Sequence, residues 1–212
     1  MKTVLTAIVS LAAIPCMAAD HILIQLREND SSVLLLDRAE TDGSRRAAVL
    51  TPSQSPGRVI VERKKHPDPA DWTEVRWVIR FDLSQVPTMF RQAKLHVWCQ
   101  GTAGAPKVMP KLELIASSDP QRIVSADRMS QPLLSKTQEI VFPERPQMIE
   151  LDVTAMVQEA QKQKQPSAAF RISAVCDQPE CETGEPQNFY LGSFTNVWQW
   201  PQSEPPVLEI IP

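Results

Sequence analysis

The sequence predicts an all-β protein, a two-sheet antiparallel β-sandwich of jelly-roll type, with one short helix near residues 154–164. Three observations support this prediction. Short runs of alternating apolar and polar residues recur along the chain, as expected of strands that bury one face. Proline is abundant (19 residues) and glycine sparse (6), which favours short strands joined by stiff loops. Helical periodicity is convincing in only one segment.

The predicted strands are short, and loops rich in Pro, Asp, Ser and Gln separate them. Alternation is clearest in runs 75–83, 93–99 and 168–176. The apolar faces of the first two runs comprise Val75, Trp77, Ile79, Phe81 and Leu83, then Ala93, Leu95, Val97 and Cys99. The full set of predicted strands is 21–26, 33–36, 59–63, 75–83, 93–99, 111–116, 138–142, 148–151, 168–176, 188–194 and 207–211. Stretches 45–57 and 64–71 are expected to be loops. Many short strands with one apolar face indicate two stacked sheets.

The predicted helix follows the strand at 148–151. Thr154 is a favoured N-cap residue, and Pro166 would end the helix. Met156, Val157 and Ala160 form a narrow apolar stripe between these limits. We expect Asp152 to pin the helix start together with Thr154, and Asp82 to accept backbone N–H bonds at a strand end.

The N-terminus has the pattern of a secretory signal peptide. One positive charge at Lys2 precedes an apolar stretch over 4–15, and small residues then offer cleavage after Ala18 or Ala19. The apolar stretch is too short to span a membrane, which takes about 20 residues. We therefore expect residues 1–19 to be removed and 20–212 to form one domain in a secreted protein, periplasmic or extracellular.

The charge balance argues against a nucleic-acid partner, and the length of the apolar segments argues against a membrane span. The chain has 22 Lys and Arg against 25 Asp and Glu, a net charge of −3, and no basic block. Such a balance disfavours nucleic acid as the main partner. No later segment approaches the length of a membrane span.

Three cysteines follow the expected leader: Cys99, Cys176 and Cys181. Cys176 and Cys181 are separated by four residues and are candidates for a disulfide. A Cys99–Cys176 bridge is the alternative, because both residues end strands in the same phase. Unpaired, Cys99 would be a small buried hydrophobe.

Catalytic patterns are absent from the sequence. His21, His66 and His96 lack metal-type spacing, and neither a Gly-x-Ser-x-Gly nor a His-Glu-x-x-His motif occurs. The sequence thus predicts a protein that is not an enzyme and needs no cofactor. A structural Ca²⁺ is an open alternative, with loop acids as candidate ligands in either of two sets: Asp68, Asp71 and Asp82, or Asp177, Glu180 and Glu182.

Three blocks along the chain resemble a known family. They are Arg80-Phe81-Asp82-Leu83-Ser84 with Val86-Pro87 and Ala93-Lys94-Leu95, then Ile149-Glu150-Leu151-Asp152-Val153-Thr154, then Leu191-Gly192-Ser193-Phe194 followed by Pro205-Pro206-Val207-Leu208. In this order they resemble the DNRLRE-domain, disaggregatase-related β-sandwich proteins, although the namesake string is absent. The resemblance implies a β-sandwich on an exported protein. Some members of that family are carbohydrate-binding modules.

Exposed aromatic rings flanked by polar groups are typical of polysaccharide-binding surfaces. Trp98 lies on the polar phase of its strand beside Lys94 and His96, and Trp198 and Trp200 would share one side of an extended segment. Arg76 and Arg80 lie on the polar phase of the preceding strand. If runs 75–83 and 93–99 pair as a hairpin, these side chains form one basic, aromatic surface suited to an acidic polysaccharide. The candidate carbohydrate-binding residues are Trp98, His96, Lys94, Arg76, Arg80, Trp198 and Trp200.

The function predicted from the sequence is therefore non-catalytic binding of polysaccharide at or outside the cell surface. A structural or assembly module that binds a protein at the cell surface is the alternative. A polysaccharide-degrading enzyme is the less favoured alternative, because carboxylate pairs meet only in space and no pair stands out in the sequence.

Overall fold

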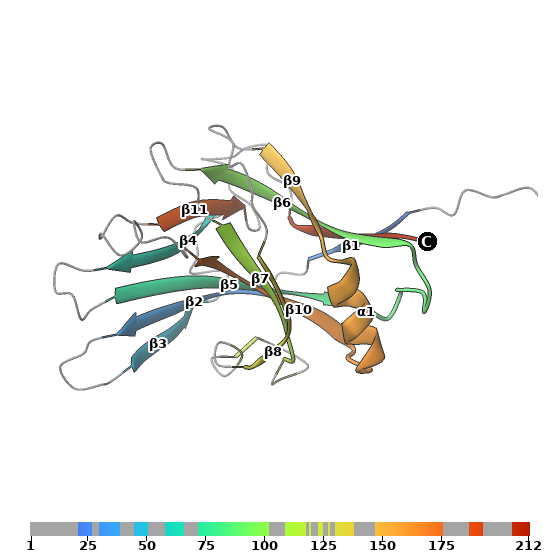
Figure 1. Cartoon of the computed structure of the whole chain (residues 1–212), viewed down its shortest axis with the longest axis horizontal. Helices are drawn as coiled ribbons and strands as arrows, with labels where there is room; N and C mark the ends of the chain where they lie inside the picture. The colour runs from blue at the N-terminus through green and yellow to red at the C-terminus, as the bar shows by residue number, and fades with distance from the viewer. Residues whose placement is uncertain are drawn as a thin grey trace, which may run out of the picture.

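A computed structural model of the 212-residue chain defines the fold (Figure 1). The structure describes residues 21–26, 30–38, 45–50, 58–65, 72–101, 109–117, 119, 123–124, 127, 130–137, 147–175, 187–192 and 205–212. The expected signal peptide lies outside these residues, as do Trp198, Trp200, Cys176 and Cys181 and the loop acids Asp68, Asp71, Asp177, Glu180 and Glu182.

Twelve strands and one helix make up the described chain. The strands are β1 (Ile22–Gln25), β2 (Ser31–Arg38), β3 (Arg45–Leu50), β4 (Arg58–Lys65), β5 (Trp72–Asp82), β6 (Gln92–Gly101), β7 (Met109–Ile115), β8 (Pro132–Thr137), β9 (Gln147–Asp152), β10 (Ser167–Val175), β11 (Gln187–Gly192) and β12 (Val207–Ile211). The helix is α1 (Thr154–Lys162), between β9 and β10.

The strands form a two-layer antiparallel β-sandwich, as predicted. Their hydrogen-bonded order is β1-β12-β6-β11-β4-β5-β10-β7-β8, with β9 also on β6 and the β2–β3 pair also on β5. One layer, which we call the β6 layer, contains β9, β6, β12 and β1, and the other, the β5 layer, contains β3, β2, β5, β10, β7 and β8 (Figure 1). Strands β11 and β4 link the two layers.

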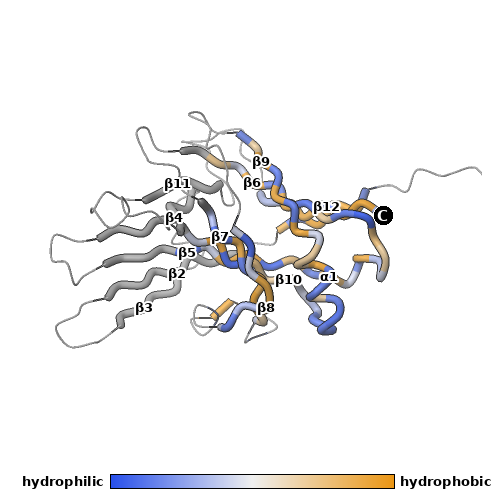
Figure 2. Tube along the Cα trace, in the orientation of Figure 1, coloured by the Kyte–Doolittle hydropathy of each residue, from blue (hydrophilic) through white to orange (hydrophobic). Residues whose placement is uncertain are grey.

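The hydrophobic core lies between the two layers. Trp77 and Ile79 of β5 are fully buried, as are Leu95 and Val97 of β6. The rings of Phe81 and Phe170 pack with centroids 6.1 Å apart. Each such side chain contributes roughly 1.5–3 kcal/mol when fully buried. The apolar faces predicted for 75–83 and 93–99 are confirmed from Trp77 to Leu83 and from Ala93 to Cys99, while the side chain of Val75 lies outside the description; Figure 2 shows the alternation along β6 and β10.

Helix α1 packs its predicted stripe of Met156, Val157 and Ala160 into this core at one end of the sandwich (Figure 1). The prediction that Thr154 is the N-cap is wrong, because the cap is Val153, which makes no side-chain cap bond. The Thr154 hydroxyl instead accepts the Ala93 N–H at 3.0 Å, tying the helix to β6.

Asp152 pins the helix start as predicted. Its Oδ1 accepts bonds from the Thr154 N–H at 3.0 Å and from the Thr154 hydroxyl at 2.6 Å. The helix ends at Lys162, two residues before the predicted limit, and Lys164 then takes a positive φ of 55°. The Lys164 N–H donates to the Gln161 carbonyl at 2.8 Å, and this bond closes the end of the helix.

Several strand boundaries differ from those predicted. Strand β3 occupies part of the stretch 45–57, which was expected to be a loop, because residues 45–50 pair with β2. Strand β4 extends through Lys65, shortening the expected loop 64–71. Strand β8 was not predicted, since it begins with a proline and lies at the sheet edge. The predicted strand 138–142 lies outside the described residues.

Cys99 is a free, fully buried thiol, so the alternative Cys99–Cys176 bridge is wrong. Burial raises the pKa of this thiol to about 12, which keeps it protonated. Among the described residues, no helix is long and apolar enough to cross a membrane.

Candidate functional site

The runs 75–83 and 93–99 do not pair as a hairpin, the condition for one basic, aromatic surface, and this divides the candidate residues between two surfaces. Strand β5 pairs with β2, β4 and β10, whereas β6 pairs with β9, β11 and β12. The two strands face each other across the core (Figure 1). Arg76 and Arg80 therefore point away from the core on the β5 layer, while Lys94, His96 and Trp98 do so on the β6 layer. They do not form one basic surface.

Arg80 is buried, with 5% of its surface exposed, and its guanidinium binds other residues of the chain. Its Nε donates to Asp30 Oδ1 at 2.8 Å, and its Nη2 donates to the same oxygen. Its Nη1 donates to the Asp119 carbonyl at 2.9 Å. The Arg80 guanidinium therefore anchors the chain before β2 and the segment after β7.

A second buried arginine, missed in the sequence, has the same role. Arg171 of β10 donates from Nε to Glu113 Oε2 at 2.6 Å and from Nη1 to the carbonyls of Asp127 and Ser130 at 3.2 and 3.0 Å. The sequence does hold a signal for this pair, because Glu113 and Arg171 each lie on the polar phase of an otherwise apolar run. Asp119, Asp127 and Ser130 thus lie against the outer face of the β5 layer.

Glu113 is held ionised at this covered face. Burial alone would raise its pKa, but hydrogen bonds from Arg171 and Lys111 outweigh burial and lower it. The Nζ of Lys111 lies 2.9 Å from Glu113 Oε1. The charges of Glu113, Arg171 and Lys111 are satisfied by one another, so we do not assign ligand binding to this group.

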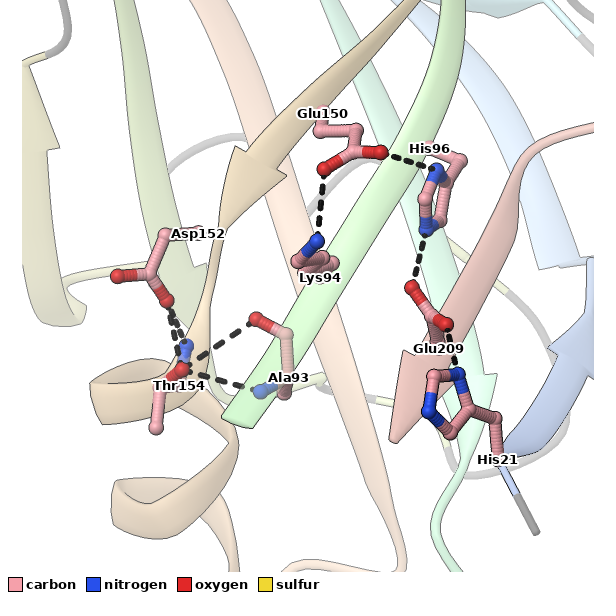
Figure 3. Close-up of polar contacts among 8 residues, drawn as sticks. All are labelled: His21, Ala93, Lys94, His96, Glu150, Asp152, Thr154 and Glu209. Carbon is pink, nitrogen blue, oxygen red and sulfur yellow. Dashed lines mark hydrogen bonds and ion pairs between the residues drawn. The ribbon is translucent and has the colours of Figure 1, made fainter. Parts of the chain in front are cut away.

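The outer face of the β6 layer carries a linked polar network across four adjacent strands (Figure 3). The network comprises His21 beside β1, Glu209 of β12, Lys94 and His96 of β6, and Glu150 of β9. The cross-strand register places His96 opposite Glu150 and Lys94 opposite Glu209, so period-two alternation brings all of these side chains to one surface.

The distances within this network are short. Glu209 binds two imidazoles, one on each carboxylate oxygen: His21 Nδ1 at 2.6 Å and His96 Nε2 at 2.8 Å. On the other side, Lys94 Nζ donates to Glu150 Oε2 at 2.8 Å, and His96 Nδ1 lies 4.0 Å from Glu150 Oε1. His96 therefore lies between two carboxylates, as Figure 3 shows.

Both carboxylates of the network are held ionised. The Lys94 hydrogen bond is the main cause that lowers the pKa of Glu150, and the same bond raises the pKa of Lys94. Burial would raise the pKa of Glu209, but the hydrogen bonds from His96 and His21 outweigh it and lower that pKa. The network therefore presents fixed negative oxygens and their donors near neutral pH.

Trp98 lies on the same outer face, on β6 opposite Met148 of β9. Its side chain is half-buried, and its Nε1 is buried with no hydrogen-bond partner in the part of the chain that the structure describes. An unpaired buried donor costs about 1–3 kcal/mol. The indole therefore turns its N–H inward while the residue stays partly exposed.

Asp82 is the one calcium candidate among the described residues. Its Oδ1 accepts the Ser84 N–H at 2.8 Å, which confirms the predicted strand-end anchor. Within the described residues, no group of three or more His, Cys, Asp or Glu is arranged to hold a metal ion.

Comparison with known proteins places the chain in no family. No family model matches it, and no curated protein matches it. Among solved structures, it is similar to a carbohydrate-binding module of the β-sandwich superfamily, at 9% identity and a TM-score of 0.26. That match covers 76% of this chain and 72% of the other. A likeness at this TM-score does not indicate a function, so the function proposed for this chain is based on the geometry of the polar network.

Proposed function

We propose that this protein is a secreted, non-catalytic module that binds polysaccharide on the outer face of the β6 layer. The observation that carries the proposal is the network of His21, Glu209, His96, Lys94 and Glu150 beside the half-buried Trp98. Export rests on the predicted signal peptide, and membership of the DNRLRE-domain family remains a prediction from the three sequence blocks.

The chemistry of this face suits a sugar chain. Sugar hydroxyls both donate and accept hydrogen bonds, and the network offers carboxylate acceptors, an ammonium donor and imidazoles. These side chains hold one another in place, which lowers the entropy that binding would cost. Apolar side chains lie among them, namely Trp98, the half-buried Val207 and Ile211, and Leu23 with 62% of its surface exposed. Such groups can pack against the C–H face of a pyranose.

The charges favour a neutral polysaccharide over an acidic one. The basic surface expected from the sequence required Arg76 and Arg80, which lie on the other layer. On the β6 layer, the two ionised carboxylates of Glu150 and Glu209 face one lysine and two histidines. The two carboxylates offset the lysine, so this surface has no excess of fixed positive charge to attract polyuronates.

The same carboxylates argue against glycoside hydrolysis. Glycosidases with two carboxyl groups keep one protonated as a general acid, which takes a raised pKa. Glu150 and Glu209 both have lowered pKa values because donors surround them. This supports binding without catalysis.

Affinity gel electrophoresis tests the proposal. Gels containing neutral polysaccharides (hydroxyethylcellulose, β-glucan, mannan or starch) should retard the purified protein, and gels containing alginate or pectin should not. We expect Trp98→Ala to abolish the retardation and Glu150→Ala, at a half-exposed position, to weaken binding about tenfold, the equivalent of one hydrogen bond to a charged group.

The control is Lys162→Ala, which removes an exposed charge of α1 away from the network. Circular dichroism and the melting temperature show whether each variant folds. Retardation that survives in folded Trp98→Ala and Glu150→Ala would place binding elsewhere. If no polysaccharide retards the protein and one stable protein partner is captured instead, the assembly module is favoured.

A further inference from the structure

A polar pocket opens where β1 of one layer runs beside the end of β5 of the other. Its volume is about 160 Å³, and the residues that line it include Leu23, Gln25, Asp30, Arg80, Asp82, Ser84 and Gln85. The cross-strand register explains the opening. Strand β2 starts at Ser31, opposite Ile79, so it leaves the edge of β5 from Arg80 onward without a β2 neighbour. None of the five residues of the polar network borders this space.

The pocket contains a fixed acceptor. Arg80 directs both Nε and Nη2 to Oδ1 of Asp30, so Asp30 Oδ2 accepts no hydrogen bond from any described residue. Asp30 and Arg80 are themselves buried, at 9% and 5% exposure. A buried carboxylate held by an arginine and left with one open oxygen is a rigid hydrogen-bond acceptor for a ligand hydroxyl.

Adaptable polar groups surround that acceptor. Gln25, Ser84 and Gln85 are exposed, and their side chains make no hydrogen bond within the described part of the chain. Two amides and a hydroxyl supply both donors and acceptors. The Ser84 N–H bond to Asp82 holds the turn that positions Ser84 and Gln85.

The charges select a neutral ligand. Asp30 and Asp82 disfavour an anion, while the Arg80 guanidinium beside Asp30 disfavours a metal cation. The small volume excludes a long chain, since drug-sized ligands occupy about 300–1,000 Å³. A single neutral, polyhydroxylated ring meets these conditions.

We propose that this pocket is a second subsite, which binds one terminal or branching sugar residue of the polysaccharide held on the β6 layer. The proposal rests on the proposed function for the link between the two surfaces. Leu23 supplies that link, because it borders the pocket and also lies opposite Glu209 in the register of the outer face. A chain lying on the network would reach the pocket across β1.

NMR titration of the full chain with glucose, galactose and mannose, each alone, tests the subsite. We expect at least one sugar to shift the backbone amide signals of Ser84 and Gln85 and the side-chain amides of Gln25 and Gln85. The double variant Gln25→Ala/Gln85→Ala should weaken this binding about tenfold or more, because two hydrogen-bonding groups are lost. Both positions are exposed, so the variant should fold. Ser84→Trp, which fills the mouth of the pocket, is the second variant.

The two proposals fail separately. Trp98→Ala should abolish polysaccharide retardation yet leave the monosaccharide shifts at Ser84 and Gln85 intact. If none of the three sugars shifts these signals up to high-millimolar concentration, or if the shifts survive in both pocket variants, the subsite is overturned. That result would not contradict polysaccharide binding on the β6 layer, which the gel retardation tests separately. If no polysaccharide retards the unaltered protein but the monosaccharide shifts at the pocket are present, the proposed function is refuted and the subsite is not.

Discussion

Arg80 and Arg171 have related roles on the outer face of the β5 layer. Each pairs with one carboxylate, Asp30 or Glu113, and each donates a further bond to the carbonyl of a residue between 119 and 130. Both lie on the polar phase of an alternating strand, so sequence alone reads them as exposed. Their burial depends on residues distant in sequence, among them Asp119 and Asp127, and alternation does not reveal such contacts.

Breaking one of these pairs should destabilise the protein strongly. Arg171→Met leaves Glu113 buried without its main partner, so we expect a loss of about 3–5 kcal/mol in the free energy of unfolding. Urea denaturation followed by circular dichroism measures this. The double variant Arg171→Met/Glu113→Met should recover part of the loss, because no uncompensated charge remains. A single variant no less stable than the double one would contradict this account.

At the scale of elements, α1 depends on contacts to strands at its N-terminal end. Asp152 of β9 binds the first residue of the helix, and Thr154 binds Ala93 of β6. The Thr154 hydroxyl bond is the main cause of the lowered pKa of Asp152, with the Thr154 N–H second. The helix thus joins two strands of the β6 layer to β10.

Removing the Asp152 carboxylate should loosen this junction. Asp152→Ala leaves the Thr154 N–H without its acceptor, and we expect a loss of about 1 kcal/mol. Urea denaturation of the variant measures it. The matched control is Glu159→Ala, whose bonds to Lys162 and Gln163 are exposed and should cost little. Equal losses in the two variants would show that the junction at Asp152 has no special role.

For the whole molecule, the layers were predictable and their pairing was not. Period-two alternation is a local property, so the inward faces of Trp77, Phe81 and Leu95 could be read from the sequence. The neighbour of each strand is decided by contacts far apart in the chain, and β5 and β6 therefore stack although they are consecutive. The candidates Lys94, His96 and Trp98 do share a surface, but Glu150, Glu209 and His21 join them only through the register.

The buried Cys99 should report opening of the whole sandwich. Its thiol is fully buried in the core between the layers, and its pKa of about 12 leaves little thiolate. We expect iodoacetamide to modify Cys99 only at the rate of global unfolding, as read by peptide mass spectrometry across a urea series. Fast modification in the absence of urea, with unchanged circular dichroism, would show local opening near β6 instead.

The pairing of β1 with β12 has a consequence for how the protein is made. Strand β1 leaves the ribosome long before its partner in the sheet, β12, which is the last strand in the element order. Strand β6 likewise lacks its neighbour β12 until then. The β6 layer, with its polar network, therefore cannot form during synthesis until Glu209 has emerged. Such long-range pairing also slows folding, which would suit the export that we propose, because the chain must reach its translocation machinery before the sheet closes.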